Sequence, residues 1–266
     1  MSSEILYNVS QWGIFAFLIA LLLAAAEAGF WLSRISRSSY DDAVRAQHGA
    51  VQAAALGLLA LLLGFTFAMS MTRYESRRGM VIREANVIGT TYLRSKMLPE
   101  PQRSEIAALI GRYVDDWLDL ARADRSKDRI RSLREEVERI QKELWSRAID
   151  IAAKDKKVVP TGLFVQSLNE MIDVDAARMA ARENHVPESV LIVLYAASIM
   201  SVTLIGYGYG MAGRRNLFST LTAVLLIAVV IMLILDLDRP SRGFIRVSQQ
   251  SMLDLRNVIT GANVGH

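Results

Sequence analysis

The sequence predicts an all-α membrane protein in which four transmembrane helices carry a helical body. The hydrophobic content of 52% and the mean hydropathy of +0.24 are both high for a water-soluble chain. Four segments approach the roughly 20 apolar residues that a helix needs to cross a bilayer. The long region between the second and third segments is dense in charge and has helical rather than strand periodicity. These observations imply two environments for one chain.

The predicted spans are residues 12–32, 50–71, 190–211 and 217–235. The first is flanked by Trp12 at one end and by Phe30 and Trp31 at the other, as interfacial aromatic residues would be. A cleaved signal peptide is the alternative for this segment. Its start has no Lys or Arg and its apolar stretch is long, which favours a span.

The second span continues past Arg73 into a charged helix without a Gly or Pro cluster, as far as about residue 97. Three further helices are predicted over 103–123, 126–155 and 160–184, each from apolar residues at helical spacing. We therefore expect four regions: transmembrane helices 1 and 2 in 1–72, a cytoplasmic helical domain in 73–188, transmembrane helices 3 and 4 in 189–237, and a cytoplasmic tail in 238–266.

The distribution of arginine near the span ends predicts the orientation. The side that carries the body has twice as many as the opposite side, which places the body and both termini in the cytoplasm of a multi-pass protein. The two sets are Arg73, Arg77, Arg78, Arg83, Arg178, Arg182, Arg239, Arg242, Arg246 and Arg256 on the body side, and Arg34, Arg37, Arg45, Arg214 and Arg215 on the other.

The residue inventory argues against an enzyme. The chain has no cysteine, so disulfides, thiolate nucleophiles and Cys-ligated metals are excluded. The three histidines, His48, His185 and His266, form no metal-binding or nucleophile motif. We therefore predict no catalytic residue, metal site or cofactor. Basic residues alternate with acidic ones rather than forming a block, so nucleic acid is not an expected partner.

Three stretches carry a resemblance to a known family. The run LGF at 63–65, followed by Arg73 and Tyr74, is similar to the second helix of bestrophin ion channels. The stretches REANVIGTTYLR at 83–94 and DLDRPSRGFIRVS at 236–248 resemble bacterial bestrophin-like membrane proteins. The order of spans and helical body matches the same family, and the resemblance implies a bacterial inner-membrane location.

The resemblance implies a homopentamer, surrounded by membrane lipids, that passes small inorganic ions through a central pore lined by the second helix. Its apolar neck would fall on Gly57, Leu61 and Phe65. Gly57 departs from the family, because glycine cannot narrow a pore as isoleucine would. The acidic cluster of calcium-gated bestrophins is represented only by Asp236 and Asp238, so calcium gating is not supported.

A polar stripe follows another face of the same helix. At 100° per residue it contains Thr66, Ser70, Arg73, Arg77 and Glu84, and it lies roughly opposite the neck residues. It either faces the pore or contacts a neighbouring subunit, in which case Arg73 and Arg77 form salt bridges at the cytoplasmic exit. The alternative is that Thr66 and Ser70 bond carbonyls of their own helix and pack within the bundle.

Three acids near the spans are further candidates. Glu27 lies within the first span, where a carboxylate is costly and must face protein or water, or pair with a residue such as Arg34. Asp236 and Asp238 end the fourth span, either as an acidic pore mouth or as a capped exit from the membrane. An acidic mouth would favour cations, whereas the arginines at the exit would favour anions such as chloride.

The second function class is a non-conducting membrane scaffold or sensor. The charged segment RSLREEVERIQKELWSR at 131–147 could dock a cytoplasmic partner, with the spans serving only as anchors. The glycines at positions 206, 208, 210 and 213 lack the setting of a phosphate loop, and close helix packing with a tight turn explains them better.

Overall fold

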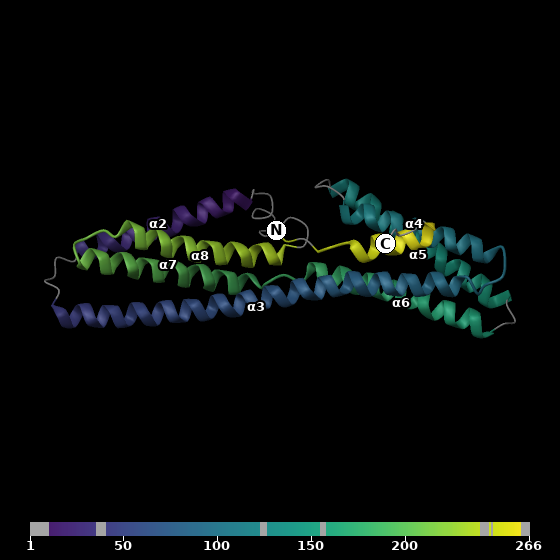
Figure 1. Ribbon diagram of the computed structural model, residues 1–266, viewed down its shortest axis with the longest axis horizontal. Helices are drawn as coiled ribbons and strands as arrows, with labels where there is room; N and C mark the ends of the chain where they lie inside the picture. The colour runs from purple at the N-terminus through teal and green to yellow at the C-terminus, as the bar shows by residue number, and fades with distance from the viewer. Residues whose placement is uncertain are drawn as a thin grey trace. The chain divides into compact units, whose positions relative to one another are not determined.

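The computed structural model describes residues 11–35, 41–122, 127–154, 158–239, 245 and 247–261. Throughout these residues the regular structure is α-helical, which confirms the predicted fold class. Four of the helices are long and apolar enough to cross a membrane, namely α2, α3, α7 and α8. The helices are α2 (Gln11–Ile35), α3 (Asp42–Ser95), α4 (Gln102–Arg122), α5 (Lys127–Lys154), α6 (Val158–Glu183), α7 (Glu188–Met211), α8 (Leu217–Asp238) and α9 (Gln250–Thr260) (Figure 1).

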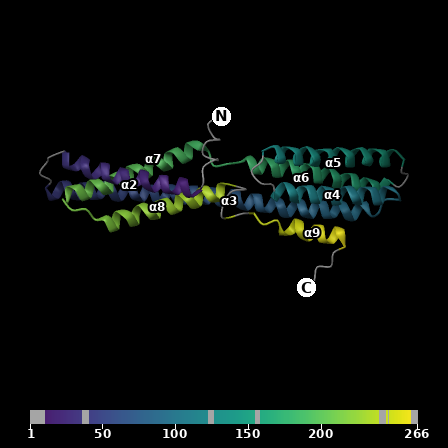
Figure 2. The same cartoon turned by 90° about the horizontal axis from the view of Figure 1, so that it is seen from above.

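The chain divides into two compact units. Unit 1 consists of Met1–Tyr74 and His185–Arg246, and unit 2 of Glu75–Asn184 and Val247–His266. Unit 1 contains α2, the first part of α3, α7 and α8, whereas unit 2 contains the rest of α3 with α4, α5, α6 and α9. The single helix α3 therefore contributes residues to both units, as its continuous ribbon in Figures 1 and 2 shows.

Unit 1 is held together by apolar side chains from all four of its helices. Leu22, Leu59, Val202 and Ile231, one from each of α2, α3, α7 and α8, are almost completely buried. The first helix turn of α3 begins at Asp42, earlier than predicted, because Asp41 Oδ1 accepts a hydrogen bond from the Val44 backbone N–H at 2.8 Å. The helix thus starts well before its apolar part.

Glycines allow α2 and α7 to approach closely. A Cβ added at Gly29 would overlap the Thr203 carbonyl oxygen, and one added at Gly206 would overlap the Ala26 carbonyl oxygen. Backbone rather than flexible side chain fills the space at both positions. Gly213 follows α7 with a φ of +65°, a left-handed conformation suited to the turn into α8. The packing interpretation of these glycines is therefore confirmed.

Unit 2 has a separate core formed by α3, α4, α5 and α6. Its largest fully buried side chains include Ile88, Tyr113, Trp117, Ile140 and Phe164. The tail contributes α9, which was not predicted; it packs against α4 with Met252 fully buried. The expected helices at 103–123, 126–155 and 160–184 correspond to α4, α5 and α6, with small differences at their ends.

Candidate functional site

One face of α3 in unit 1 is left uncovered by its own chain. Gly57, Leu61 and Phe65 lie one turn apart on this face; Gly57 is exposed, and Leu61 and Phe65 are 54% and 64% exposed. Ala68 and Thr72 continue the same face and are also exposed. These two were not among the residues predicted from the sequence, although their spacing of three and seven residues from Phe65 places them on this face.

The polar stripe faces the opposite way. Thr66 is only 3% exposed and Ser70 is fully buried, so both side chains lie inside the chain. Thr66 Oγ1 donates to the Leu62 carbonyl oxygen at 2.7 Å, the bond within the helix that was considered as an alternative. Arg73 is half-buried and Arg77 is buried. A role of this stripe toward a pore or another subunit stays a prediction.

Glu27 of α2 forms an ion pair with Arg215, which lies in the turn between α7 and α8. The Glu27 Oε2 to Arg215 Nη2 distance is 3.1 Å. Arg34, the partner considered from the sequence, instead lies over the Phe30 ring at 5.8 Å from its centroid. Sequence proximity favoured Arg34, whereas the α7–α8 turn brings Arg215 to the same helix from far along the chain.

Asp236 and Asp238 are buried at the end of α8, where they bind nearby backbone. Asp236 Oδ2 accepts a hydrogen bond from the Ile245 N–H at 2.9 Å, and Asp238 Oδ1 accepts one from the Val186 N–H at 3.0 Å. His185 Nδ1 lies 3.4 Å from Asp238 Oδ2. These contacts use the carboxylate oxygens within the chain and favour the capped exit over an acidic mouth.

A buried charge cluster lies inside unit 2, centred on Glu84 of α3. Trp117 Nε1–H of α4 donates to Glu84 Oε1 at 2.7 Å, and Arg178 Nε of α6 lies 2.7 Å from Glu84 Oε2. Arg178 also pairs with Asp175 through an Nη2 to Oδ1 distance of 2.8 Å, and its guanidinium stacks 4.7 Å from the Trp117 ring centroid. Tyr113 Oη is at 3.5 Å from Glu84 Oε1.

The cluster extends to α5 through Asp175. Gln141 Nε2 donates to Asp175 Oδ2 at 3.0 Å, and Arg134 Nη1 lies 3.5 Å from the same oxygen. Charged or polar groups from α3, α4, α5 and α6 therefore meet in one interior. From the sequence, Glu84 is expected on the polar stripe of α3 but without these partners; its position between the apolar residues Val81, Ala85 and Ile88 was the signal for burial.

Burial raises the pKa of the Glu84 carboxyl from 4.5 to about 7, an effect that the nearby Arg178 guanidinium opposes. The Asp175 carboxylate raises this pKa further, and hydrogen bonds from Trp117 and Tyr113 lower it. The same surroundings raise the pKa of the Tyr113 hydroxyl, chiefly through burial. Glu84 therefore exchanges a proton near neutral pH, at a point where four helices meet.

This pKa predicts that unit 2 loses stability as the pH rises. The folded state holds a proton on Glu84 that the unfolded state releases above its ordinary pKa of 4.5. The free energy of unfolding should thus fall by roughly 2–3 kcal/mol between about pH 5 and pH 8. Denaturant titration of the full-length protein in detergent, followed by tryptophan emission, measures it. Glu84→Gln should make the free energy of unfolding nearly independent of pH in this range. An unchanged pH dependence in that variant would mean that another group causes it.

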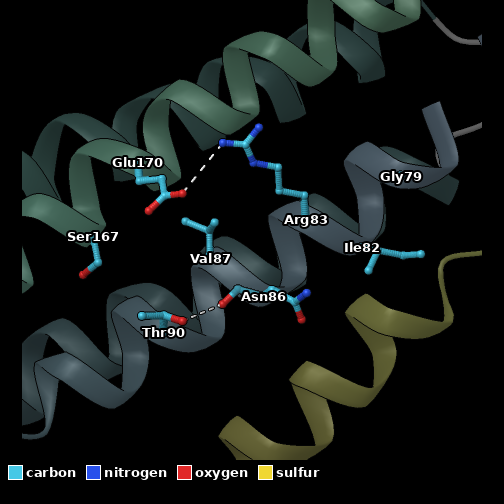
Figure 3. A pocket seen from close by; sticks show the side chains of 8 residues that line it. All are labelled: Gly79, Ile82, Arg83, Asn86, Val87, Thr90, Ser167 and Glu170. Carbon is cyan, nitrogen blue, oxygen red and sulfur yellow. Dashed lines mark hydrogen bonds and ion pairs between the residues drawn. The ribbon is translucent and has the colours of Figure 1, made fainter. Parts of the chain in front are cut away.

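A shallow groove in unit 2 lies between α3 and α6 (Figure 3). Its volume is about 380 Å³, and Arg83 and Glu170 face each other across it with an Nη2 to Oε1 distance of 3.8 Å. Both side chains are more than half exposed, so this ion pair adds little stability. Asn86, Thr90 and Ser167 add polar groups to the wall, and Ile82 and Val87 add apolar ones.

Among the described residues, no group of three His, Asp or Glu side chains could hold a metal ion. The arrangement offers an uncovered apolar helix face in unit 1 and a buried charge cluster in unit 2.

Comparisons with known proteins agree with this fold. The model of the Bestrophin-like domain matches residues 19–252. No curated protein matches the chain. A crystal structure of a bacterial bestrophin homologue from Klebsiella pneumoniae, carrying a tryptophan-to-alanine substitution, is 17% identical, with 96% of this chain and 99% of that chain covered at a TM-score of 0.68.

Two other crystal structures are similar to the same extent. Another structure of the Klebsiella pneumoniae homologue is 16% identical, covers 94% of this chain and 98% of that chain, and has a TM-score of 0.63. A structure of a membrane protein is 15% identical, covers 97% of this chain and 100% of that chain, and has a TM-score of 0.66. At such low sequence identities, the similarity to these solved structures shows only that the folds are alike. The domain match, which extends over most of the sequence and joins the four apolar helices to the helical body, shows that this membrane protein belongs to the Bestrophin-like family.

Proposed function

We propose that the chain forms a homo-oligomeric ion channel, a homopentamer by family resemblance, whose pore is lined by α3. The observation that carries the proposal is the uncovered face of α3 at Gly57, Leu61 and Phe65. The face with Thr66 and Ser70 is buried within the chain, so only the apolar face is available to a shared axis. A ring of Leu61 and Phe65 side chains would form a narrow apolar neck that gates by dewetting.

Anions such as chloride are the favoured permeant ions. Asp236 and Asp238 are buried and bind backbone N–H groups, so they contribute little negative potential to an ion path. Arg73 lies at the end of the apolar stretch on the half-buried stripe, so it would not line the neck, but its charge would add positive potential at the exit and attract anions. In this proposal α3 leaves the bacterial inner membrane at Arg73, and the helical body and both termini lie in the cytoplasm.

Phe65→Ala should raise the single-channel conductance on the order of tenfold, because removal of the ring widens and hydrates the apolar neck. The measurement is single-channel recording of the purified full-length protein in planar lipid bilayers. The reversal potential in a potassium chloride gradient gives the selectivity in the same experiment, and a shift toward the chloride equilibrium potential is expected.

Phe67→Ala is the matched control, because it removes the same ring from a different face of α3. It should leave conductance close to that of the parent protein. If Phe67→Ala raises conductance and Phe65→Ala does not, the pore-lining face is wrongly assigned. If a well-folded oligomer passes no current in any variant, the scaffold or sensor function is the better description.

A further inference from the structure

A cavity in unit 1 lies outside the proposed ion path. It has a volume of about 390 Å³, is open on one side and is lined by α2, α7, α8 and the turn between the last two. Leu23, Ala26, Phe30 and Leu221 provide apolar walls. Glu27 and Arg215 also line it and supply one charge of each sign. The site thus combines the walls for a hydrocarbon chain with an ion pair.

The Glu27–Arg215 ion pair is held by a contact with Phe30, and both charged groups can still bind a ligand. Arg215 stacks over the Phe30 ring at 4.6 Å from its centroid while its Nη2 pairs with Glu27. The two side chains are 48% and 46% exposed, so roughly half of each is not covered by the chain. A guanidinium has five N–H donors and a carboxylate has two acceptor oxygens, so each can take a second partner of opposite charge.

The surroundings of this pair narrow the class of ligand. α2, α7 and α8 are long and apolar enough to span a membrane, and Arg215 lies in the turn just outside α7 and α8, at the level where lipid head groups meet the apolar core. An anionic head group would satisfy Arg215 but meet the carboxylate of Glu27, and a purely cationic amphiphile would have the reverse difficulty. A zwitterionic head group, in which a short linker joins a phosphate to an ammonium, can pair with Arg215 and Glu27 at the same time.

We propose that this cavity binds phosphatidylethanolamine, with its phosphate at Arg215, its ammonium at Glu27 and part of an acyl chain between α2 and α8. The ammonium of ethanolamine has three N–H donors that can bond to the Glu27 carboxylate. The trimethylammonium of phosphatidylcholine has the same charge and none of these donors, which gives the site its selectivity. This inference does not depend on ion conduction.

Native mass spectrometry of the delipidated full-length protein in detergent tests the site. Phosphatidylethanolamine, phosphatidylcholine and phosphatidylglycerol with identical acyl chains are titrated separately. Phosphatidylethanolamine should bind roughly tenfold more tightly than phosphatidylcholine, the equivalent of one charge-assisted hydrogen bond. Equal affinities for these two lipids, or tighter binding of phosphatidylglycerol, would overturn the proposal on the parent protein alone.

Two variants test whether Glu27 provides the preference for phosphatidylethanolamine over phosphatidylcholine. Glu27→Gln keeps the shape of the side chain and should reduce the affinity for phosphatidylethanolamine to that of phosphatidylcholine, which itself should not change. Arg214→Gln is the matched control, since Arg214 lies in the same turn but does not line the cavity, and it should keep the full preference. A preference that survives in Glu27→Gln would place the bound lipid elsewhere.

Discussion

Arg178→Met should destabilise unit 2 by about 3–5 kcal/mol at pH 8, where Glu84 is ionised. The substitution removes the guanidinium that lies 2.7 Å from Glu84 and 2.8 Å from Asp175, and both carboxylates are almost fully buried. A buried carboxylate that loses its guanidinium keeps only weaker hydrogen bonds to offset the cost of its desolvation. Chemical denaturation of the full-length protein in detergent, followed by tryptophan emission, measures the loss. The loss should shrink toward pH 5, because Glu84 is then protonated.

Arg131→Met provides the matched control for this prediction. Arg131 pairs with Glu135 four residues along α5 at 3.1 Å, but both side chains are largely exposed. Removal of this pair should cost less than about 1 kcal/mol at any pH. Similar losses in the two variants would mean that burial of the Glu84 cluster does not determine its energy.

Gly206→Ala should destabilise unit 1 by about 3 kcal/mol or more, the upper end of the range for overpacking. The added Cβ would overlap the carbonyl oxygen and carbon of Ala26, and these backbone atoms cannot rotate away as a side chain could. α2 and α7 would have to separate along their whole contact. The expected result is a lower melting temperature and loss of the folded peak in size-exclusion chromatography in detergent.

Gly49→Ala makes the same chemical change where nothing lies within 4 Å of the added Cβ. Gly49 is in the first part of α3, in the same unit, so detergent and lipid affect both variants alike. Because alanine favours a helix over glycine, this control should be neutral or gain up to about 1 kcal/mol. A Gly206→Ala protein as stable as Gly49→Ala would show that α2 and α7 are not in backbone contact.

The fold was largely predictable because each element has a strong local signal. Uninterrupted apolar segments revealed the four helices of unit 1, and the helical spacing of Ile106, Tyr113 and Trp117 revealed α4. α9 was missed because it is short and only Met252 is buried along it. Asp42, the first residue of α3, precedes the apolar part of that helix, so hydropathy could not locate the start.

The partners of charged groups could not be predicted in the same way. Glu27 had a nearby arginine in sequence, but its partner Arg215 comes from another turn of the fold. Glu84 meets Arg178 and Trp117 only because α3, α4 and α6 pack together. The periodicity of α3 did separate the Phe65 face from the Thr66 face, but it could not tell which one the rest of the chain would cover.

The hydrogen bond from the Val186 N–H to Asp238 has a consequence for biosynthesis. The Val186 N–H just before α7 is satisfied by a carboxylate at the far end of α8, and Asp238 leaves the ribosome only after both helices have been made. Until then a polar backbone group near the start of α7 has no protein acceptor at this position. This hydrogen bond can therefore form only once the end of α8 lies beside the start of α7, which makes it a late contact in the assembly of unit 1.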